Sequence, residues 1–455
     1  MPAQRNVDVI VLGAGPAGEA CAGRAAQGGL KVALVERELV GGECSYWACM
    51  PSKALLRPGE LAAEIDRVPG VRAGRPPLDV PAALRRRDEV IHGLDDTGQL
   101  PWLEDRGVKL LRGQARLEGE RRVRVGDEVL RARRAVVVAT GSGAQLPPIP
   151  GLAEAKPWTN REATTAKRVP GRLLVLGGGV VGVEMAQAYA TLGASVALVE
   201  VLPRLIAREE RFAGEQVADA LRRLGVDLHL RTRATAIRRG RKRVTVELRR
   251  GAALAGDELL VAVGRHPRTD DLGLETVGLT PGEAIDVDAH MRARGSKWLY
   301  AIGDVNGRAL LTHAGKYQGR VAADVILGRD ASATADGAAS PRVIFTDPAV
   351  AAVGHTLASA REAGLNARAV DHPTGAIAGA SFHGRGAPGL ARIVVDEDRG
   401  VLAGATFTGP EIGELLHAAT IAVVGEVPLE RLWHAIPSFP TRSEVWLRLL
   451  ESYGL

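Results

Sequence analysis

Two cysteines, Cys44 and Cys49, lie five positions apart in the segment GGECSYWACMPSK at 41–53. Such a pair can be two unrelated core thiols, half of a metal site, or a redox-active pair. Zinc takes four ligands, and no Cys/His cluster follows, so no metal site is predicted. The pair follows a glycine-rich turn and stands at the start of a predicted helix, a position that lowers a thiol pKa below its free value of about 8.5. The position therefore favours a redox-active pair, whereas Cys21 is predicted to be a small core residue.

The glycine-rich turn belongs to a segment that occurs twice. Residues 9–36 read VIVLGAGPAGEACAGRAAQGGLKVALVE, and residues 173–200 read LLVLGGGVVGVEMAQAYATLGASVALVE. Each predicts an apolar strand, a G-x-G-x-x-G turn, an alanine-rich helix, a second strand and a terminal glutamate. The glutamate lies 23 positions after the first glycine in both copies. Two complete units with matched spacing predict two dinucleotide-binding sites.

Each glycine of the two turns has a separate task. The first permits the tight turn, the second lets the backbone approach a pyrophosphate, and the third allows close helix–strand packing. These glycines are Gly13, Gly15 and Gly18 in the first copy and Gly177, Gly179 and Gly182 in the second. Glu36 and Glu200 are predicted to accept a bond from a ribose 2′-hydroxyl. Glu200 would repel a 2′-phosphate, and the next arginine is Arg204, so NADH is favoured over NADPH.

Composition sets the broader class. A chain of 455 residues predicts two to four domains, and 46% hydrophobic with 25% charged residues is typical of a soluble enzyme. No apolar stretch approaches the roughly 20 residues of a membrane span, and no signal peptide is found, so a cytoplasmic protein without membrane contact is expected. The net charge of +6 makes nucleic-acid binding a hypothesis to consider, but the 53 acidic residues nearly balance the 59 basic ones. No nucleic-acid partner is predicted, and RRGRKR at 238–243 is interpreted as a solvated hairpin tip.

Several motifs together resemble the pyridine nucleotide–disulfide oxidoreductases, which include dihydrolipoamide dehydrogenase, glutathione reductase and mercuric reductase. The motifs are the cysteine segment, both glycine turns, Ala139-Thr-Gly141, Gly303-Asp304 and Phe345-Thr-Asp-Pro348. The resemblance covers essentially the whole chain. It implies an α/β fold with two Rossmann-like dinucleotide-binding domains and a C-terminal α+β dimerisation domain. The implied boundaries are 1–150 and 266–335 for FAD, 151–265 for NAD and 341–455 for dimerisation.

The resemblance also implies roles for individual residues. Cys49 would lie against the flavin, and Cys44 would be the exposed sulfur that attacks the substrate. Lys53, on one helical face with Cys49, would pair with Glu184 near the flavin. Asp304 would accept a ribityl hydroxyl, and the segment Leu311–Ala314 would pass beneath the flavin pyrimidine. The further positions implied to bind the cofactors are Gly42, Glu43, Thr140, Gly141, Gly264 and Gly303.

The C-terminal signature departs from the family. Relatives carry His-Pro-Thr-x-Ser-Glu, whose histidine is the base for the substrate thiol; this chain reads Phe439-Pro-Thr-Arg-Ser-Glu444. A positioned base contributes about 10²–10⁴-fold. His434 is expected to pack at a helix end rather than to replace it. Thr441 and Glu444 also form a capping-box pattern, so Glu444 has a catalytic and a capping interpretation, with capping favoured. The chain ends without the cysteine pair of mercuric reductases, so mercury reduction is not predicted.

The leading hypothesis is an enzyme that passes electrons from NADH through FAD to Cys44–Cys49 and on to a small disulfide or dithiol acceptor, in a homodimer. The alternative is an NAD(P)H:quinone or other small-acceptor reductase that works directly from the flavin. Phe439 in place of the base motivates it, together with Tyr46 and Trp47 between the cysteines, which could narrow the dithiol mouth or stack on a planar acceptor. A third hypothesis, a flavoprotein that serves as an interaction module, depends on the basic surface alone.

Overall fold

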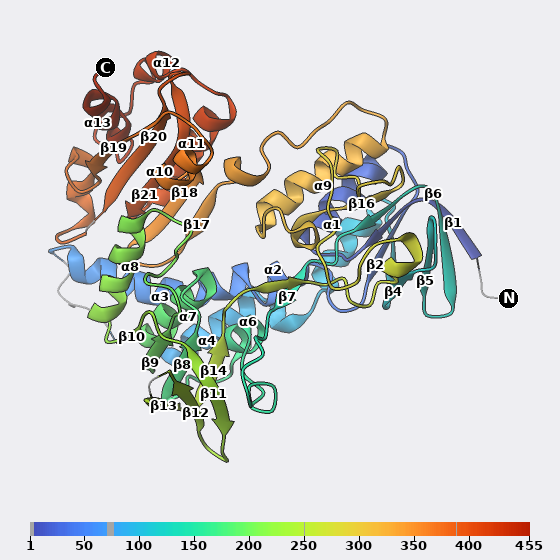
Figure 1. The fold of residues 1–455 in the computed structure, drawn as a ribbon, viewed down its shortest axis with the longest axis horizontal. Helices are drawn as coiled ribbons and strands as arrows, with labels where there is room; N and C mark the ends of the chain where they lie inside the picture. Colours follow the sequence, from blue (N-terminus) through green and yellow to red (C-terminus); the bar gives the residue numbers. More distant parts are fainter. Residues whose placement is uncertain (1–3, 71–76, 250, 388) are drawn as a thin grey trace. The chain divides into compact units, whose positions relative to one another are not determined.

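The structure is a computed structural model that describes residues 4–70, 77–249, 251–387 and 389–455 (Figure 1). It divides into two compact units. The first contains Met1–Pro51, Asp88–Ala144 and Arg265–Gly337, and the second contains Ser52–Arg87, Gln145–Gly264 and Ala338–Leu455. The first unit thus joins the start of the chain to a segment more than a hundred residues later. The finer boundaries between FAD, NAD and dimerisation domains stay a prediction.

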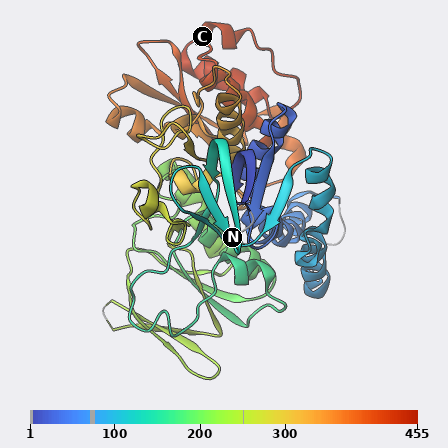
Figure 2. The same cartoon turned by 90° about the vertical axis from the view of Figure 1, so that its right-hand side faces the viewer.

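The first unit is built on a seven-stranded sheet of order β3-β2-β1-β6-β5-β4, with β16 paired to β6. Its strands are β1 (Gln4–Leu12), β2 (Val32–Glu36), β3 (Lys109–Arg112), β4 (Ala115–Leu117), β5 (Arg122–Val125), β6 (Glu128–Val138) and β16 (Leu299–Ala301). Strands β3, β2, β1, β6 and β16 run parallel, whereas β4 and β5 add an antiparallel edge. In Figure 2 the blue β1 lies beside the teal β6. The apolar run Val9–Leu12 is fully buried, as expected for a parallel strand covered on both faces.

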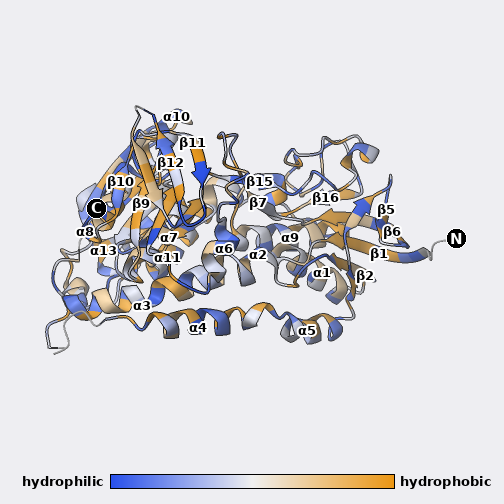
Figure 3. Ribbon diagram, turned by 90° about the horizontal axis from the view of Figure 1, so that it is seen from below, coloured by the Kyte–Doolittle hydropathy of each residue, from blue (hydrophilic) through white to orange (hydrophobic). Residues whose placement is uncertain are grey.

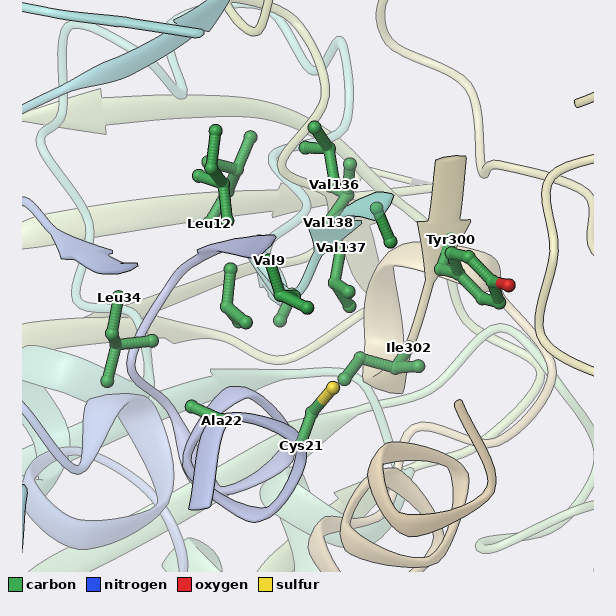
Figure 4. Packing of buried hydrophobic residues seen from close by; sticks show 14 of the residues in the cluster. Val9, Leu12, Cys21, Ala22, Leu34, Val136, Val137, Val138, Tyr300 and Ile302 are labelled. Atoms are coloured by element: carbon green, nitrogen blue, oxygen red, sulfur yellow. The ribbon is translucent and has the colours of Figure 1, made fainter. Parts of the chain in front are cut away.

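Two helices, α1 (Pro16–Gln27) and α9 (Thr312–Ile326), pack closely against each other in this unit. A Cβ atom on Gly319 would lie 2.6 Å from the Ala17 carbonyl oxygen, so only glycine allows this approach. Cys21 and Ala22 point from α1 into the core beneath the sheet, which confirms that Cys21 is a small core residue (Figure 4). The other helices here are α2 (Gly42–Tyr46), α5 (Leu100–Glu104) and the start of α3 (Cys49–Arg67). A two-stranded ribbon pairs β7 (Ser142–Ala144) with β15 (Arg265–Pro267).

The second unit holds a parallel sheet of order β10-β9-β8-β14 and an antiparallel sheet of order β11-β12-β13. The parallel strands are β8 (Arg172–Leu176), β9 (Ser195–Val199), β10 (Asp227–His229) and β14 (Glu258–Val261), and the others are β11 (Ala234–Arg239), β12 (Val244–Leu248) and β13 (Ala253–Gly256). Its helices are α4 (Val80–Val90), α6 (Asn160–Thr165), α7 (Val180–Thr191) and α8 (Arg211–Arg223). Hydrophobic and hydrophilic residues alternate along α4 (Figure 3). The turn between β11 and β12 carries the RRGRKR segment, which confirms the hairpin tip.

The last quarter of the chain forms its own antiparallel sheet of order β17-β18-β21-β20-β19. These strands are β17 (Arg342–Ile344), β18 (Ala349–Gly354), β19 (Ala367–Pro373), β20 (Leu390–Asp396) and β21 (Val401–Gly409). Its helices are α10 (Leu357–Glu362), α11 (Ile412–Val424), α12 (Leu429–Trp433) and α13 (Glu444–Tyr453). A separate apolar cluster between this sheet and its helices gives the segment its own core. Among the residues that the structure describes, no helix is long and apolar enough to cross a membrane.

Candidate active site

The first glycine turn connects β1 to α1. Gly13 has a φ of +103°, and a Cβ atom there would lie 2.4 Å from the Ala139 carbonyl oxygen. A Cβ atom on Gly18 would lie 1.9 Å from the Gly13 carbonyl oxygen, so the helix can approach the turn only with glycine at this position. A Cβ atom on Gly15 would meet no atom within 4 Å. The space beside Gly15, at the start of α1, is therefore open in the way a pyrophosphate requires.

The second glycine turn, between β8 and α7, repeats this geometry in the other unit. Gly177 has a φ of +105°, and a Cβ atom there would lie 2.3 Å from the Ala262 carbonyl oxygen. A Cβ atom on Gly182 would lie 1.9 Å from the Gly177 carbonyl oxygen, and one on Gly179 would meet nothing within 4 Å. The two turns thus match in conformation as well as in sequence, and each fits a dinucleotide.

The glutamate at the end of each unit is bound to its own glycine turn. Glu36 Oε2 accepts the N–H of Ala14 at 2.7 Å, and Oε1 accepts the N–H of Glu38 at 2.7 Å. Glu200 accepts the two equivalent backbone N–H groups, both at 2.6 Å. Because a carboxylate oxygen can accept more than one hydrogen bond, each glutamate can still receive a ribose hydroxyl.

The cysteine loop lies directly against the first glycine turn. Gly41 and Gly42 have φ values of +108° and +56°, which only glycine adopts readily. A Cβ atom on Gly42 would lie 2.8 Å from the Gly15 Cα atom. From this contact the chain enters α2, which carries Cys44, and Cys49 is the first residue of α3. The two glycines therefore bring the cysteines next to the predicted pyrophosphate site.

The thiols of Cys44 and Cys49 are partly buried and share a hydroxyl neighbour. Cys49 Sγ lies 3.4 Å from Thr312 Oγ1 on α9. A hydrogen bond with Cys49, followed by burial, raises the pKa of the Cys44 thiol well above its usual range, while Thr312 and Lys316 oppose the rise. The prediction of a lowered pKa is wrong for Cys44, because it considered only the helix start and not the neighbouring thiol.

Two aromatic residues separate the cysteines. Tyr46 is 1% exposed, and its hydroxyl donates to the Asp95 carbonyl oxygen at 3.5 Å. Burial raises the pKa of Tyr46 to about 12. Tyr46 thus packs into the unit instead of narrowing the dithiol mouth or offering a face to an acceptor, which corrects that expectation. Trp47 is half-buried beside it, with ring centroids 5.7 Å apart.

A network of charged and hydroxyl groups joins the cysteine loop to the Gly-Asp turn. Arg268 donates to Glu43 Oε1 at 2.6 Å. Ser142 Oγ donates to Asp304 Oδ2 at 2.5 Å and accepts a bond from Arg265 Nε at 2.7 Å. Arg265 Nε also lies 3.7 Å from the Asp304 carboxylate. These contacts hold the Asp304 carboxylate in a fixed position, which suits a group predicted to accept a ribityl hydroxyl.

The remaining predicted FAD residues belong to the same unit. Thr140 Oγ1 donates to the Arg268 carbonyl oxygen at 2.8 Å, and Gly141 follows with a φ of +70°. Gly303 has a φ of +73°, and Ala314 is buried in the first turn of α9. The first unit therefore gathers every residue predicted to bind FAD except Lys53 and Glu184.

Lys53 and Glu184 form the predicted ion pair within the second unit. Lys53 Nζ lies 2.8 Å from Glu184 Oε2 and 4.6 Å from the centroid of the Phe345 ring. Glu184 Oε1 accepts the Phe345 N–H at 3.0 Å. The phenylalanine of the Phe-Thr-Asp-Pro motif thus contacts both members of the pair.

The second glycine turn has apolar neighbours in its own unit. Gly264, also predicted to contact a cofactor, follows β14 with a φ of +157°, and a Cβ atom there would lie 2.9 Å from Gln145 Oε1. Val180 at the start of α7 and Val263 beside Gly264 are both exposed.

The C-terminal signature folds differently from the capping-box prediction. Helix α13 begins at Glu444 itself, with Ser443 as N-cap and no side-chain capping bond. Glu444 Oε2 accepts the Ala378 N–H at 3.0 Å, and Oε1 accepts Arg448 Nη2 at 2.8 Å. The capping-box prediction is therefore wrong, because the Glu444 carboxylate accepts the N–H of the distant residue Ala378 and not that of Thr441. His434 lies at the end of α12, as predicted, but its side chain is exposed and does not pack there. Phe439 is 76% exposed.

Sequence reasoning missed three residues of the site. Thr312, Arg265 and Arg268 all contact predicted residues, but none belongs to a motif with a fixed spacing to its partner. The only available signal was the position of two of them, because Arg265 directly follows Gly264 and Thr312 lies within the segment that ends at Ala314.

Comparison with known proteins gives the same family throughout. The family model for pyridine nucleotide-disulphide oxidoreductase matches residues 7–319, and that for the dimerisation domain of these enzymes matches 340–449. The chain is 35% identical over 458 residues to a dihydrolipoyl dehydrogenase of Thermus scotoductus, covering 98% of this chain and 97% of that one. The flavoprotein disulfide reductase RclA of Escherichia coli is similar in structure, with a TM-score of 0.85, 27% identity and coverage of 98% and 99%. LpdA of Mycobacterium tuberculosis has a TM-score of 0.87 at 26% identity, with coverage of 99% and 100%.

Proposed function

Because this chain belongs to the pyridine nucleotide–disulphide oxidoreductases, an FAD-dependent family of enzymes, we propose that it moves electrons from NADH to the Cys44–Cys49 pair and on to a small disulfide or dithiol acceptor. The observation that best supports this function is the contact between the cysteine loop and the first glycine turn, where Gly42 lies against Gly15. The relatives, dihydrolipoyl dehydrogenases and flavoprotein disulfide reductases, favour this function over direct quinone reduction from the flavin.

FAD, when bound, supplies the two-electron chemistry that connects NADH to a disulfide. The Cys44–Cys49 disulfide accepts two electrons and two protons and becomes a dithiol. Cys44 then loses its proton, and its thiolate attacks one sulfur of the acceptor disulfide, whose S–S bond breaks as a mixed disulfide forms and the leaving thiolate takes up a proton. Cys49 attacks Cys44, which restores the enzyme disulfide and releases the second acceptor thiol. With a dithiol substrate the same steps run in reverse.

The division of roles between the two cysteines is proposed from the family resemblance. Cys49 begins α3 and contacts Thr312 of the segment assigned to the flavin pyrimidine, and Cys44 in α2 shares this hydroxyl neighbour. Lys53 and Glu184 would hold a positive charge at the flavin, where reduction adds negative charge.

The second nucleotide is proposed to be NADH. Glu200 holds its carboxylate at the turn with two backbone hydrogen bonds. Arg204, the first arginine after it, donates to the carbonyl oxygens of Glu209 and Ala207 at 2.7 and 2.5 Å. To bind a 2′-phosphate, Arg204 would have to give up both bonds, whereas a ribose 2′-hydroxyl suits Glu200.

A homodimer is proposed because the segment matched to the dimerisation domain carries exposed apolar side chains. They are Ile421, Val424, Trp433, Ile436 and Phe439. Sedimentation equilibrium should give a dimer for the native chain and a monomer for Ile421→Glu. Leu61→Glu, an exposed site on α3 outside this segment, should leave the dimer intact. A native monomer would contradict the proposal.

We also propose a cytoplasmic location, because a chain with three cysteines has no framework of structural disulfides that would need an oxidising compartment.

The deciding experiment is anaerobic titration of the holoenzyme with NADH. The native protein should take up two electrons and develop a long-wavelength band from a thiolate beside oxidised flavin. Cys49→Ser should abolish the band, Cys44→Ser should keep it but lose lipoamide turnover, and Cys21→Ala, at a core thiol, should change neither. A band that persists in Cys49→Ser would contradict the assignment. Quinone reduction unaffected by Cys44→Ser, without any disulfide turnover, would support the flavin-only alternative.

A further inference from the structure

The backbone of the Gly303–Asp304 turn is bound by one side chain of α9. Gln318 is fully buried, and its Oε1 accepts the Gly303 N–H at 2.7 Å. The same oxygen accepts Asn306 Nδ2 at 2.9 Å, and Asn306 Nδ2 also donates to the Ala301 carbonyl oxygen at 3.1 Å. Because Gly303 directly precedes Asp304, these bonds fix the backbone that carries the predicted ribityl acceptor.

Gln318 can bind the turn in only one orientation of its side-chain amide. The groups of Gly303 and Asn306 that face it are both donors, so they need the amide oxygen and not the amide nitrogen. The nitrogen, Nε2, instead donates to Asp336 Oδ1 at 2.9 Å. Since an ionised carboxylate can only accept hydrogen bonds, Asp336 selects the orientation that points the Gln318 oxygen at the turn.

Asp336 lies in the segment after α9 and is itself held in place. Its side chain is 5% exposed, and its Oδ2 lies 3.1 Å from Arg308 Nη1. Arg308 Nη2 donates to the Val287 carbonyl oxygen at 2.6 Å, and the Arg308 backbone N–H donates to Asn306 Oδ1 at 3.1 Å. The contacts thus form a closed ring of four residues: Asp336, Gln318, Asn306 and Arg308.

We propose that Gln318 and Asp336 are positioning residues for FAD retention: Gln318 holds the Gly303–Asp304 turn, and Asp336 fixes the amide of Gln318. The proposal depends on the family-based role of Asp304 as the ribityl acceptor. Asp336 lies at the end of the first unit, which closes at Gly337, and the segment matched to the dimerisation domain begins at residue 340. Residues far from every recognised FAD motif therefore contribute to the FAD site.

The role of Asp336 is tested by its asparagine variant. In Asp336→Asn, Arg308 takes the one remaining oxygen, so the new amide nitrogen faces Gln318 and turns the Gln318 oxygen away from Gly303. A buried N–H without a partner costs enough free energy that FAD should leave the diluted holoenzyme about tenfold faster, measured as the rise in flavin fluorescence. Gln318→Met, which removes the amide, should have an effect of the same size.

Exchanging donor and acceptor between the two positions should restore retention. In the double variant Gln318→Glu with Asp336→Asn, the asparagine nitrogen donates to the new carboxylate, whose oxygens can accept from Gly303 and Asn306. FAD release should return to the native rate. Gln318→Met with Asp336→Asn should stay fast. Gln27→Glu and Asp330→Asn make the same changes at exposed sites of the same unit and should release FAD as the native protein does.

Hydrogen exchange at the Gly303 amide, measured on the holoenzyme with excess FAD, is the second readout. Exchange should speed up about tenfold in Asp336→Asn and Gln318→Met and return to the native rate in the double variant with glutamate. Native FAD release in both single variants overturns the proposal, as does a double variant that stays as fast as Asp336→Asn. Neither readout involves electron transfer, so a failed redox titration of the cysteine pair would leave this result standing.

Discussion

The Lys53 ammonium lies 2.8 Å from one oxygen of Glu184, and the other oxygen of the same carboxylate accepts the backbone N–H of Phe345. The side chain of Glu184 is only 4% exposed, while that of Lys53 is 33% exposed. Each oxygen of the buried carboxylate thus has one partner, whereas the ammonium of Lys53 is partly exposed. The ion pair therefore holds the Lys53 ammonium in a fixed position and leaves part of it accessible to solvent.

Replacing Glu184 by glutamine should leave the Lys53 ammonium less firmly held in its position. The amide oxygen can keep the bond to Phe345, but Lys53 loses its counter-ion, so the free energy of unfolding should fall by about 2 kcal/mol, less than for a fully buried pair. Flavin reduction by NADH, followed by stopped-flow absorbance, should slow by roughly tenfold, the effect of about 1.4 kcal/mol. The exposed pair Arg211–Glu215 supplies the control, since Glu215→Gln should change stability by about 0.5 kcal/mol or less. Unchanged reduction in Glu184→Gln would argue against a role for the pair at the flavin.

The two equivalent glutamates should separate the two nucleotides. Glu200→Gln should raise the KM for NADH by about tenfold, because loss of one charge-assisted hydrogen bond costs about 1.5 kcal/mol, and should leave the FAD content intact. Glu36→Gln, the matched change in the first unit, should lower FAD retention during gel filtration and leave the KM for NADH unaffected in the FAD-loaded fraction. Equal effects of both variants on FAD would contradict the assignment of separate sites.

Stability should depend on pH through Glu19. Burial raises the pKa of Glu19 in the folded chain from 4.5 to about 7, so folding favours the neutral form of this carboxyl group. That contribution is complete below about pH 4.5 and is lost as the pH rises through about 7. Glu19→Gln should therefore match the native chain in urea unfolding near pH 5 and exceed it near pH 8 by roughly 2–3 kcal/mol. A constant difference across this range would mean that Glu19 titrates normally in the folded protein.

Placing a histidine at position 439 should test the missing base. Because Phe439 is 76% exposed, Phe439→His should cost little stability. If the acceptor is a dithiol or disulfide, kcat/KM for lipoamide should rise by about 10²-fold, the lower end of what a positioned base contributes. Phe382→His, another exposed phenylalanine of the same segment, should have no such effect. An equal gain in both variants would indicate a nonspecific surface effect.

Local sterics explain what the sequence could predict. The third glycine of each turn, Gly18 or Gly182, meets the carbonyl oxygen of the first glycine of the same turn, so the G-x-G-x-x-G spacing predicted this close approach. Gly13 and Gly177 instead meet Ala139 and Ala262, which lie far along the chain, so the motif predicted a glycine at each position but not these contacts. The pair Lys53–Glu184, 131 positions apart, was predictable only through family resemblance.

Contacts without a motif could not be predicted. Thr312 lies 263 positions from Cys49, and Arg268 lies 225 positions from Glu43, so nothing in the local pattern joins them. Two of the wrong predictions have the same origin. The capping box of Glu444 was judged from neighbouring residues, but its partner Ala378 comes from 66 positions away. The pKa of Cys44 was judged from the helix start, but the second thiol dominates it.

The close approach of Gly42 to Gly15 has an evolutionary consequence. Any side chain at position 42 would push the cysteine loop off the turn that is predicted to hold the cofactor's pyrophosphate, because its Cβ atom would lie 2.8 Å from the Gly15 Cα atom. Cofactor retention and the electron affinity of the disulfide therefore cannot drift independently, since a displacement of either segment displaces the other. Selection on one trait constrains the other, and variation in acceptor preference has to arise elsewhere in the chain, as at Phe439.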